Sequence, residues 1–567
     1  MTGARALDRF DVPGRWIVVW LLVAYTGVVA LHLASGLDVE AWDDAYFFKR
    51  IGLNILQHGS AAWNLREGPV YGNTSQGFQV VTLLPLLFGA DYYISIMKFV
   101  SALAMVLTLV LYLRAARRSG DLAFAAGVAF LGACGPFLLL LIHSGMETNT
   151  SFVVLAINLL VIHDSAGRTR RQQVVAVVIT TLLVYLTRPD AVAISLVTIA
   201  VHSTLGERKP DWRLLGCCLA GLLAVLAVCY LYFGSPFPLA FYLKSRPLTA
   251  YATQFVDLDL VPKRRNLVGL LVMAAPLVHV AAHGRSAWSR ALLAAAAVFV
   301  AYHYFFTVEV MGYYARFYVP AMVPVTLAAI DAAPRWRERS HALLTLAFVV
   351  VYGAVLLLLY RHRLVYDAKD PMHMRVDRAL YLGYAIAASV LLLGAHVQAS
   401  WAAILVALPL AVGSVRGLPL PPLVVHDDAT LLAKHIERFT TVRGILAVRA
   451  CIPPPFRMYH TEIGIPGVLF PSATITDMAG LMDKEFARAG MSFDARCEKD
   501  RPELIFLPHR NYKVQRDRIL NGTCIRDYQL VVSNSSSPLY VRKDLAGDFV
   551  ACAHRMGDRW VDGAPQP

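Results

Sequence analysis

Two adjacent carboxylates, Asp43 and Asp44, follow the first long apolar run of the chain, residues 15–35, within the segment EAWDDAY at 40–46. The apolar run is long enough to cross a bilayer, so the two side chains are expected at a membrane surface. A carboxylate beside a second carboxylate can have its pKa raised toward the working pH, which suits a general base. The pair therefore indicates acid/base chemistry at the level of the lipid head groups. The structural alternative is that one Asp, Asp44 in particular, is the N-cap of the helix that follows.

The composition places these carboxylates in a polytopic membrane protein. Of the 567 residues, 57% are hydrophobic and only 16% are charged, which excludes a soluble globular protein. Counting apolar runs of about 20 residues predicts roughly thirteen transmembrane helices. They begin near Arg15, Tyr93, Asp121, Thr148, Val174, Ala191, Trp212, Asn266, Trp288, Arg316, His341, Arg378 and Ser400.

The basic residues predict the orientation of these spans. With the N-terminus inside, most Lys and Arg clusters fall in cytoplasmic loops, as the positive-inside rule requires. These clusters lie at 114–118, 168–171, 208–209, 285–290 and 335–339, and the loop after Tyr360 is the exception. The net charge of +14 is then a consequence of topology and implies no nucleic-acid partner. Five outer segments carry the polar groups: 43–75, 143–149, 188–190, 232–263 and 303–316.

The first outer segment is expected to contain two interfacial helices. Between Asp44 and His58 the apolar residues recur at helical spacing, with Lys49 and Arg50 on other faces, which predicts a helix lying on the membrane. The run 76–90 is short for a span and contains Pro85, so we expect an outer helix there.

The chain divides into a transmembrane domain, 1–417, and a small α/β domain, 418–567, on the outer side. A helix is predicted at 430–442, a buried strand at 503–507, and a hairpin from 528–532 and 539–542. The four cysteines of this domain are compatible with two disulfides in an oxidising compartment, with the pairing left open. They are Cys451, Cys497, Cys524 and Cys552.

A succession of short motifs on the outer side resembles a known family. It runs GNTS (72–75), SGME (144–147), LTRPD (186–190) and YFGSPFP (232–238), continuing to Tyr242 and Lys244. With the acidic pair in the first outer loop, this resembles the GT-C glycosyltransferases that use polyprenyl-phosphate sugars. More narrowly, it is similar to the terminal arabinofuranosyltransferases of the AftB type and their proteobacterial relatives. The segments EIG (462–464) and DMAGL (477–481) also resemble that group, and imply a lid that helps to place the acceptor or a structural turn.

The resemblance implies a fold, a reaction and its partners. The enzyme would move a sugar, arabinofuranose or a similar pentofuranose, from a polyprenyl-phosphate donor to a hydroxyl of a cell-envelope glycan or glycoprotein. It would act at the periplasmic face of the bacterial inner membrane. Asp43 or Asp44 would be the catalytic base, with Asp43 slightly preferred. The other Asp would orient the acceptor or hold a divalent cation, Mg²⁺ or Mn²⁺.

The donor's phosphate needs fixed cations where negative charge builds up in the transition state. Arg188, Lys244 and Arg316 are the outer cations chosen for this role, since Arg binds phosphate bidentately and Lys acts as a point charge. Asp190 is assigned to structure.

Several further outer residues are candidates for binding substrate. Glu147 could accept hydrogen bonds from sugar hydroxyls or cap the helix that begins near Thr148. His303 could bind phosphate or shuttle a proton. The remaining candidates are Asn73, Ser75 and Tyr242, while Glu309, Tyr313 and Tyr314 complete an aromatic and ionisable group near Arg316.

Two other functions fit a polytopic protein of this kind. A flippase or transporter of lipid-linked glycans would place ionisable groups near mid-membrane on broken helices, whereas here they collect on one side. A polymerase that joins two lipid-linked chains would share the outer cations.

Overall fold

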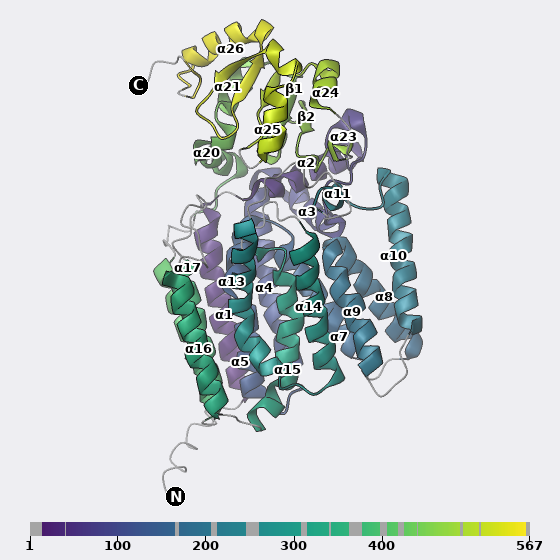
Figure 1. Cartoon of the computed structure of the whole chain (residues 1–567), viewed down its shortest axis with the longest axis vertical. Helices are drawn as coiled ribbons and strands as arrows, with labels where there is room; N and C mark the ends of the chain where they lie inside the picture. Colours follow the sequence, from purple (N-terminus) through teal and green to yellow (C-terminus); the bar gives the residue numbers. More distant parts are fainter. Residues whose placement is uncertain are drawn as a thin grey trace, which may run out of the picture.

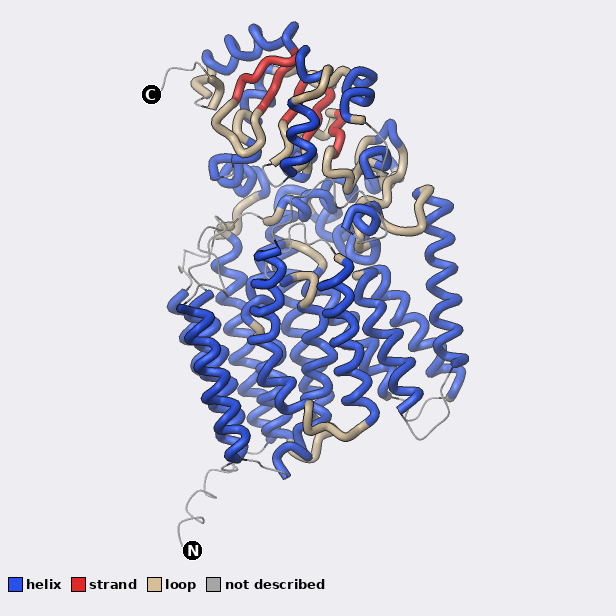
Figure 2. The backbone as a smooth tube through the Cα atoms, viewed as in Figure 1, coloured by secondary structure: helices blue, strands red, loops and turns tan. Residues whose placement is uncertain are grey.

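A helical bundle capped at one end by an α/β unit makes up the computed structural model (Figure 1). The structure describes residues 14–39, 41–164, 169–205, 212–244, 260–307, 315–338, 342–361, 377–396, 405–417, 424–438, 440–487, 492–509, 512–558 and 560–562. Figure 2 shows that the strands are confined to the α/β unit and that helices form the rest. The chain is therefore organised along one axis, with the first outer loop between its two parts.

In the described part of the chain a helix begins within four residues of ten of the thirteen predicted starts. The start at Asn266 lies inside a helix that begins at Leu260, the start at Arg316 lies six residues before a helix, and the start at Ser400 lies outside the described residues. By length and composition, four helices in the described part of the chain can cross a membrane: Gly14–Leu37, Ala90–Ala116, Trp212–Phe233 and Ala287–Phe306. The bent pair Leu122–Ala133 and Pro136–Ser144, with an angle of 51°, makes a fifth span if counted as one. The chain is thus a multi-pass membrane protein, and the number thirteen stays a prediction. The bundle helices are α1 (Gly14–Leu37), α4 (Tyr93–Ala116), α5 (Leu122–Ala133), α6 (Pro136–Leu140), α7 (Thr148–His163), α8 (Arg170–Thr187), α9 (Val192–Leu205), α10 (Trp212–Phe233), α13 (Leu260–Ala281), α14 (Ala287–Phe306), α15 (Met322–Glu338), α16 (Ala342–Arg361), α17 (Asp377–His396) and α19 (Ala407–Gly417).

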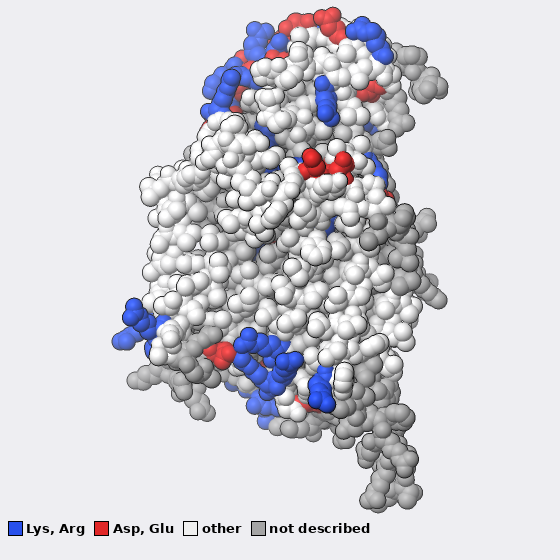
Figure 3. Space-filling model, turned by 180° about the vertical axis from the view of Figure 1, so that it is seen from behind, with Lys and Arg blue, Asp and Glu red and all other residues white. Residues whose placement is uncertain are grey.

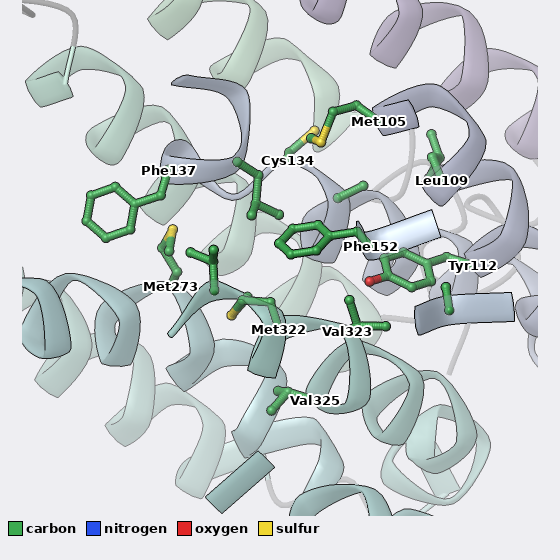
Figure 4. Close-up of a cluster of buried hydrophobic side chains, with 14 of the residues drawn as sticks. Met105, Leu109, Tyr112, Cys134, Phe137, Phe152, Met273, Met322, Val323 and Val325 are labelled. Atoms are coloured by element: carbon green, nitrogen blue, oxygen red, sulfur yellow. The ribbon is translucent and has the colours of Figure 1, made fainter. Parts of the chain in front are cut away.

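The bundle is held by apolar packing inside and presents apolar side chains outside. Figure 4 shows part of the core, where side chains from α4, α7, α13 and α15 meet around Phe152. Large apolar residues such as Leu231 and Leu343 are more than 80% exposed on the outer surface. Space-filling atoms show a middle band nearly free of charge, with Lys and Arg gathered at the end opposite the α/β unit (Figure 3). This is the surface expected of a protein surrounded by lipid.

The α/β unit is built on a five-stranded sheet of order β2-β1-β3-β5-β4. β1 pairs in parallel with β2 and β3, and the other pairings are antiparallel. The predicted buried strand and hairpin are confirmed as β3 and β4–β5, and the predicted helix 430–442 is α20 followed by a 3-10 turn. The elements are α20 (Asp428–Arg438), α21 (Ile445–Cys451), β1 (Arg457–His460), α22 (Gly464–Leu469), β2 (Thr474–Asp477), α23 (Lys484–Ala487), α24 (Phe493–Asp500), β3 (Leu504–Phe506), α25 (Lys513–Leu520), β4 (Tyr528–Val532), β5 (Leu539–Arg542) and α26 (Lys543–Arg555).

Two disulfides pin helices onto this sheet. Cys451 at the end of α21 bonds Cys552 in α26, with Cα atoms 5.8 Å apart. Cys497 in α24 bonds Cys524 at the start of a 3-10 turn, with a Cα separation of 6.1 Å. All four cysteines proposed from the sequence are thereby paired within the unit.

The first outer loop contributes helices α2 (Asp43–His58) and α3 (Gln76–Phe88). Asp43 and Asp44 in the first turn of α2 complement the positive end of the helix dipole. Gly59, with a φ of 68°, ends the helix in the left-handed conformation that glycine adopts without strain. Lys49 and Arg50, which the periodicity places on other faces of the helix than the apolar residues, are only 6% and 5% exposed, because the α/β unit covers α2.

Four polar side chains of the first outer loop fasten the α/β unit to it, and we call them the clamp: Asp43, Lys49, Arg50 and Asn64. The two carboxylate oxygens of Asp43 accept the backbone N–H groups of Gly464 and Ile465, both at 2.9 Å, at the start of α22. Arg50 donates to the carbonyls at the other end of α22, Gly467 at 2.8 Å and Phe470 at 3.2 Å.

The rest of the clamp binds elsewhere on the α/β unit. Lys49 forms a 2.6 Å ion pair with Asp428 of α20. Asn64 exchanges two hydrogen bonds with the backbone of Ile475 in edge strand β2, donating at 2.9 Å and accepting at 3.0 Å. The approach is close enough to need glycine, since a Cβ on Gly464 would lie 2.1 Å from the Asp43 carbonyl oxygen. The first outer loop and the α/β unit therefore form one packed structure.

Candidate active site

A cavity of about 440 Å³ lies where the bundle, the first outer loop and the α/β unit meet. Seven residues chosen from the sequence line it: Asp44, Asn73, Glu147, Arg188, Lys244, His303 and Arg316. They come from α2, the segment before α3, the N-cap of α7, the end of α8, α11 (Leu239–Lys244), α14 and the segment before α15. Residues up to 272 positions apart in the chain are thus brought together by the bundle.

Asp44 and Arg316 form a buried ion pair in the wall of the cavity. Arg316 Nη2 lies 3.1 Å from Asp44 Oδ2, and the guanidinium stands 5.3 Å from the ring centroid of Trp42. Arg316 is 6% exposed and Asp44 8%. The second oxygen of Asp44, Oδ1, is buried and has no hydrogen-bond partner in the described part of the chain. Asp44 therefore keeps one acceptor atom available for a ligand.

Arg188 is held in place by three partners. It donates to the backbone carbonyl of Arg316 at 2.8 Å, contacts Thr148 Oγ1 at 3.5 Å, and lies 3.2 Å from Asp190. Asp190 also lies 3.0 Å from Nε2 of His303. Asp190 thus fixes both Arg188 and His303 against the cavity wall.

Lys244 supplies a cation with no counterpart. Among the described residues it has no ion pair, and its Nζ stands 5.6 Å from the ring centroid of Phe317. Burial and, to a smaller extent, the nearby Arg316 lower the pKa of Lys244 to about 8, against Asp44 and Glu147, which raise it. An anionic ligand would raise this pKa again and so stabilise the charged form of the lysine.

Glu147 has the opposite sign and a similar lack of partners. It is 8% exposed, and its Oε2 is buried with no hydrogen-bond partner in the described ranges. It occupies the N-cap position of α7, but its side chain makes no capping hydrogen bond. The capping role considered from the sequence is therefore not the one its side chain performs.

Asp43 is oriented away from this chemistry. It does not line the cavity, and both of its oxygens are bound to the start of α22. Burial raises the pKa of Asp43 to about 7, against the two backbone hydrogen bonds, which lower it. The geometry reverses the preference drawn from the sequence: Asp44, rather than Asp43, reaches the cavity. Neither is the N-cap of α2, since that position is Trp42.

The remaining candidates are placed at the margins. Asn73 lines the cavity, and its amide donates to Gln79 Oε1. Ser75 and Tyr242 do not line it; Ser75 is the N-cap residue of α3, and the Tyr242 hydroxyl accepts a hydrogen bond from Ser235 at 3.3 Å. Residues 309, 313 and 314 lie outside the described part of the chain.

Sequence reasoning missed the apolar part of the wall. Phe317, Met146, Leu481 and Met482 line the cavity, the last two from the α/β unit. A Cβ on Gly72 would lie 2.1 Å from Met482 Sδ, so the α/β unit is in direct contact with the segment before α3. Apolar side chains carry no chemical signal in a hydrophobic sequence, although the DMAGL motif at 477–481 pointed to this loop.

The carboxylates that the sequence predicts to hold a divalent cation are Asp43 and Asp44. Among the described residues no group of three His, Cys, Asp or Glu side chains is placed to hold a metal ion. Both Asp43 oxygens and one Asp44 oxygen already bind other groups. The divalent cation stays a prediction, and no step below is derived through it.

Comparisons with known proteins find similar structures but no similar sequences. No protein-family model matches the chain, and no curated protein matches its sequence. The structure is similar to that of ArnT from Cupriavidus metallidurans bound to undecaprenyl phosphate, with a TM-score of 0.55, 17% identity and coverage of 94% of this chain and 98% of that chain. Against the apo state of ArnT the TM-score is 0.57 at 16% identity, covering 93% and 98%. The two chains share their architecture over nearly their full lengths.

Proposed function

We propose that the protein is a membrane glycosyltransferase that takes its sugar from a polyprenyl-phosphate donor. The observation that carries the proposal is the charge arrangement of the cavity: it is lined by Arg188, Lys244 and Arg316 together with a carboxylate, Asp44, one oxygen of which has no partner among the described residues. Fixed cations stabilise a phosphate that leaves, and a carboxylate takes the proton of an attacking hydroxyl. A transferase with a lipid-phosphate leaving group needs both.

The reaction follows from this placement. The acceptor oxygen attacks the anomeric carbon of the donor sugar and gives its proton to Asp44 Oδ1. The bond between that carbon and the phosphate oxygen breaks, and the electron pair leaves with the lipid phosphate. Lys244 and Arg316 face the added negative charge, and Lys244 is the cation without a carboxylate partner in the described chain.

The apolar wall supports a lipid as the leaving group. Val192 and Ala193 of α9 and Leu222 and Leu226 of α10 line the cavity beside the charged residues. A prenyl chain can pack there while its phosphate meets the cations. The ArnT structure with the same architecture was determined with undecaprenyl phosphate bound, which favours a polyprenyl monophosphate here.

The distribution of charge supports a periplasmic site in a bacterial inner membrane. Lys and Arg gather at the bundle end opposite the α/β unit (Figure 3), and such clusters mark the cytoplasmic side. The cavity, the disulfides and the α/β unit would then all face the periplasm, where disulfides persist. The donor would enter from the outer leaflet.

The sequence motifs support a choice of the transferred sugar and of the acceptor molecule. We propose a pentofuranose, with arabinofuranose the first to test, and a hydroxyl of a cell-envelope glycan or glycoprotein as acceptor. The motif order GNTS, SGME, LTRPD and YFGSPFP supports this choice, and all four motifs supply cavity residues, among them Asn73, Glu147, Arg188 and Phe237.

A transfer assay tests the function. The purified protein would be given a panel of polyprenyl-phosphate sugars, pentofuranose and hexose, with envelope extract as acceptor. Transfer of one sugar supports the proposal and identifies the donor. A folded protein that transfers none of them refutes it, and translocation of lipid-linked glycans into liposomes would then be measured.

A further inference from the structure

The loop between β1 and α22, residues 461–463, is held at both of its ends. His460 Nδ1 accepts the backbone N–H groups of Thr461 at 2.9 Å and Glu462 at 3.1 Å. Asp43 accepts the N–H groups of Gly464 and Ile465. The backbone of this loop is therefore preorganised against the first turn of α2, one residue from the proposed base.

The side chain at the centre of this loop, Glu462, has no partner among the residues that the structure describes. Glu462 is half-buried and makes no ion pair or side-chain hydrogen bond within the described ranges. It lies two residues from Gly464, which touches Asp43, so its Cα is within about 8 Å of that contact. Burial, followed by Asp43, Asp44 and Asp477, raises the pKa of Glu462 well above its ordinary value. Leaving a carboxyl group here without a partner costs stability.

Two further polar atoms, each within three residues of the contact between Asp43 and Gly464, lack partners in the described chain. The hydroxyl of Thr461, a residue only 5% exposed, is buried and makes no hydrogen bond in the described chain. Asp44 Oδ1 is the second such atom. Buried polar atoms are nearly always hydrogen-bonded in folded proteins, so unpartnered ones in the same region point to a ligand.

We propose that Glu462 and Thr461 bind the hydroxyls of the acceptor and present one of them to Asp44. The inference rests on the proposed function and deepens it by placing the second substrate. The three cations line the cavity, whereas Glu462 and Thr461 do not line it and belong to the loop of the α/β unit whose far end is bound to Asp43. The lipid donor therefore occupies the cavity, and a hydroxyl-rich acceptor, a sugar unit of a glycan, approaches from the half-exposed side of Glu462.

The charge at this place selects the class of acceptor. Burial and the neighbouring carboxyl groups raise the pKa of Glu462, which favours its protonated, uncharged form, and no cation among the described residues pairs with it to attract an anionic ligand. Carboxyl and hydroxyl groups instead match the alternating donors and acceptors of sugar hydroxyls. The acceptor bound here is a neutral sugar terminus.

The test separates the two substrates kinetically. Wild type, Glu462→Ala, Glu462→Gln and Thr461→Val would be compared with Glu498→Ala, an exposed carboxylate of the same unit in α24. Envelope extract in a dilution series serves as acceptor, and hydrolysis of the donor without acceptor reports on the donor side. We expect Glu462→Ala to raise the apparent KM for acceptor about 3- to 10-fold, with donor KM and hydrolysis unchanged. Glu462→Gln should show a smaller rise in the KM for acceptor than Glu462→Ala, and Glu498→Ala should behave as wild type.

Each other outcome counts against the inference. An unchanged acceptor KM, or an equal rise in donor KM, overturns it while the transferase function stands. If Glu462→Ala fails to fold, Thr461→Val, of nearly the same volume, carries the test, and an unchanged acceptor KM for that variant overturns it. If wild type transfers no sugar, the proposed function fails together with this inference.

Discussion

Helix α2 has charged residues in two buried regions that differ in how completely they are paired. In the clamp, the Asp43 carboxylate, the Lys49 ammonium and the Arg50 guanidinium each bind groups of the α/β unit. In the cavity, Asp44 Oδ1, Glu147 Oε2 and the Lys244 ammonium have no partner among the described residues. The carboxylates Asp43, Asp44 and Glu147 are all only 7–8% exposed, so burial does not distinguish the two regions for these groups.

This difference distinguishes charged residues that hold the fold together from charged residues that are available to bind or act on a ligand. A buried charge that is fully hydrogen-bonded is a fixed part of the fold, and removing one partner is strongly destabilising. A buried charged group with an atom that has no hydrogen-bond partner lowers the stability of the free protein, and a bound ligand can supply the missing partner. The adjacent residues Asp43 and Asp44 fall on opposite sides of this division, and the predictions below test it.

The largest effect is expected for Asp44→Asn. Losing a positioned base should lower the transfer rate about 10²- to 10⁴-fold while the melting temperature stays near that of wild type. Asp43→Asn is the matched variant and should instead lower the melting temperature, because an amide cannot accept both N–H groups of α22. If Asp43→Asn abolished transfer without loss of stability while Asp44→Asn retained it, the division between the two regions would be reversed.

Lys244→Gln comes next. Removing one fixed donor from a site of developing charge typically costs about 10²- to 10³-fold in rate, and the fold should be unaffected because Lys244 has no partner in the described chain. The assay is transfer at saturating donor. Lys499→Gln, an exposed residue of α24, is the control. Unchanged transfer by Lys244→Gln would remove this lysine from the phosphate site.

Gly464→Ala tests the clamp. Its new methyl group would lie 2.1 Å from the Asp43 carbonyl oxygen, so α22 must move, at a cost of about 1–3 kcal/mol. Thermal unfolding should shift downward, and transfer should fall with the docked fraction. Gly547→Ala in α26 meets nothing within 4 Å and should be neutral or stabilising. Equal melting temperatures for the two variants would mean that the approach of Gly464 to Asp43 leaves room for a methyl group.

The smallest effect is a dependence of stability on pH. Burial raises the pKa of Asp477 to about 7, although its oxygens accept the N–H groups of Ala479 and Met482. Between about pH 4, the pKa in the unfolded chain, and pH 7, the folded state holds a proton that the unfolded state releases. The free energy of unfolding should therefore decrease as pH rises through this window, and Asp43 acts in the same direction.

Melting curves at pH 5 and pH 7.5 measure this slope. Wild type should lose a few degrees on going to the higher pH. Asp477→Asn, which does not titrate, should lose less. A slope that is identical in the two proteins would show that Asp477 does not contribute to it.

The sequence predicted what depends on local pattern and residue type. Helix positions and the hairpin follow from periodicity, and the polar ends of apolar runs identified Arg188, Lys244 and Arg316, which meet in one cavity. It could not separate Asp43 from Asp44, since the two are identical in type and the partner of Asp43 lies 421 residues away. For the same reason the burial of Lys49 and Arg50 was missed.

The distance along the chain between the two halves of the clamp has a consequence for biosynthesis. Asp43 is made 421 residues before Gly464, and at about 5–20 residues per second the interval is on the order of tens of seconds. During that time α2 has been synthesised but has no covering unit, and the loop bearing Glu462 does not yet exist. A nascent chain that is already inserted in the bilayer therefore lacks the residues that the α/β unit contributes to the cavity wall, Leu481 and Met482, and the proposed site becomes complete only when the last part of the protein has folded onto the first.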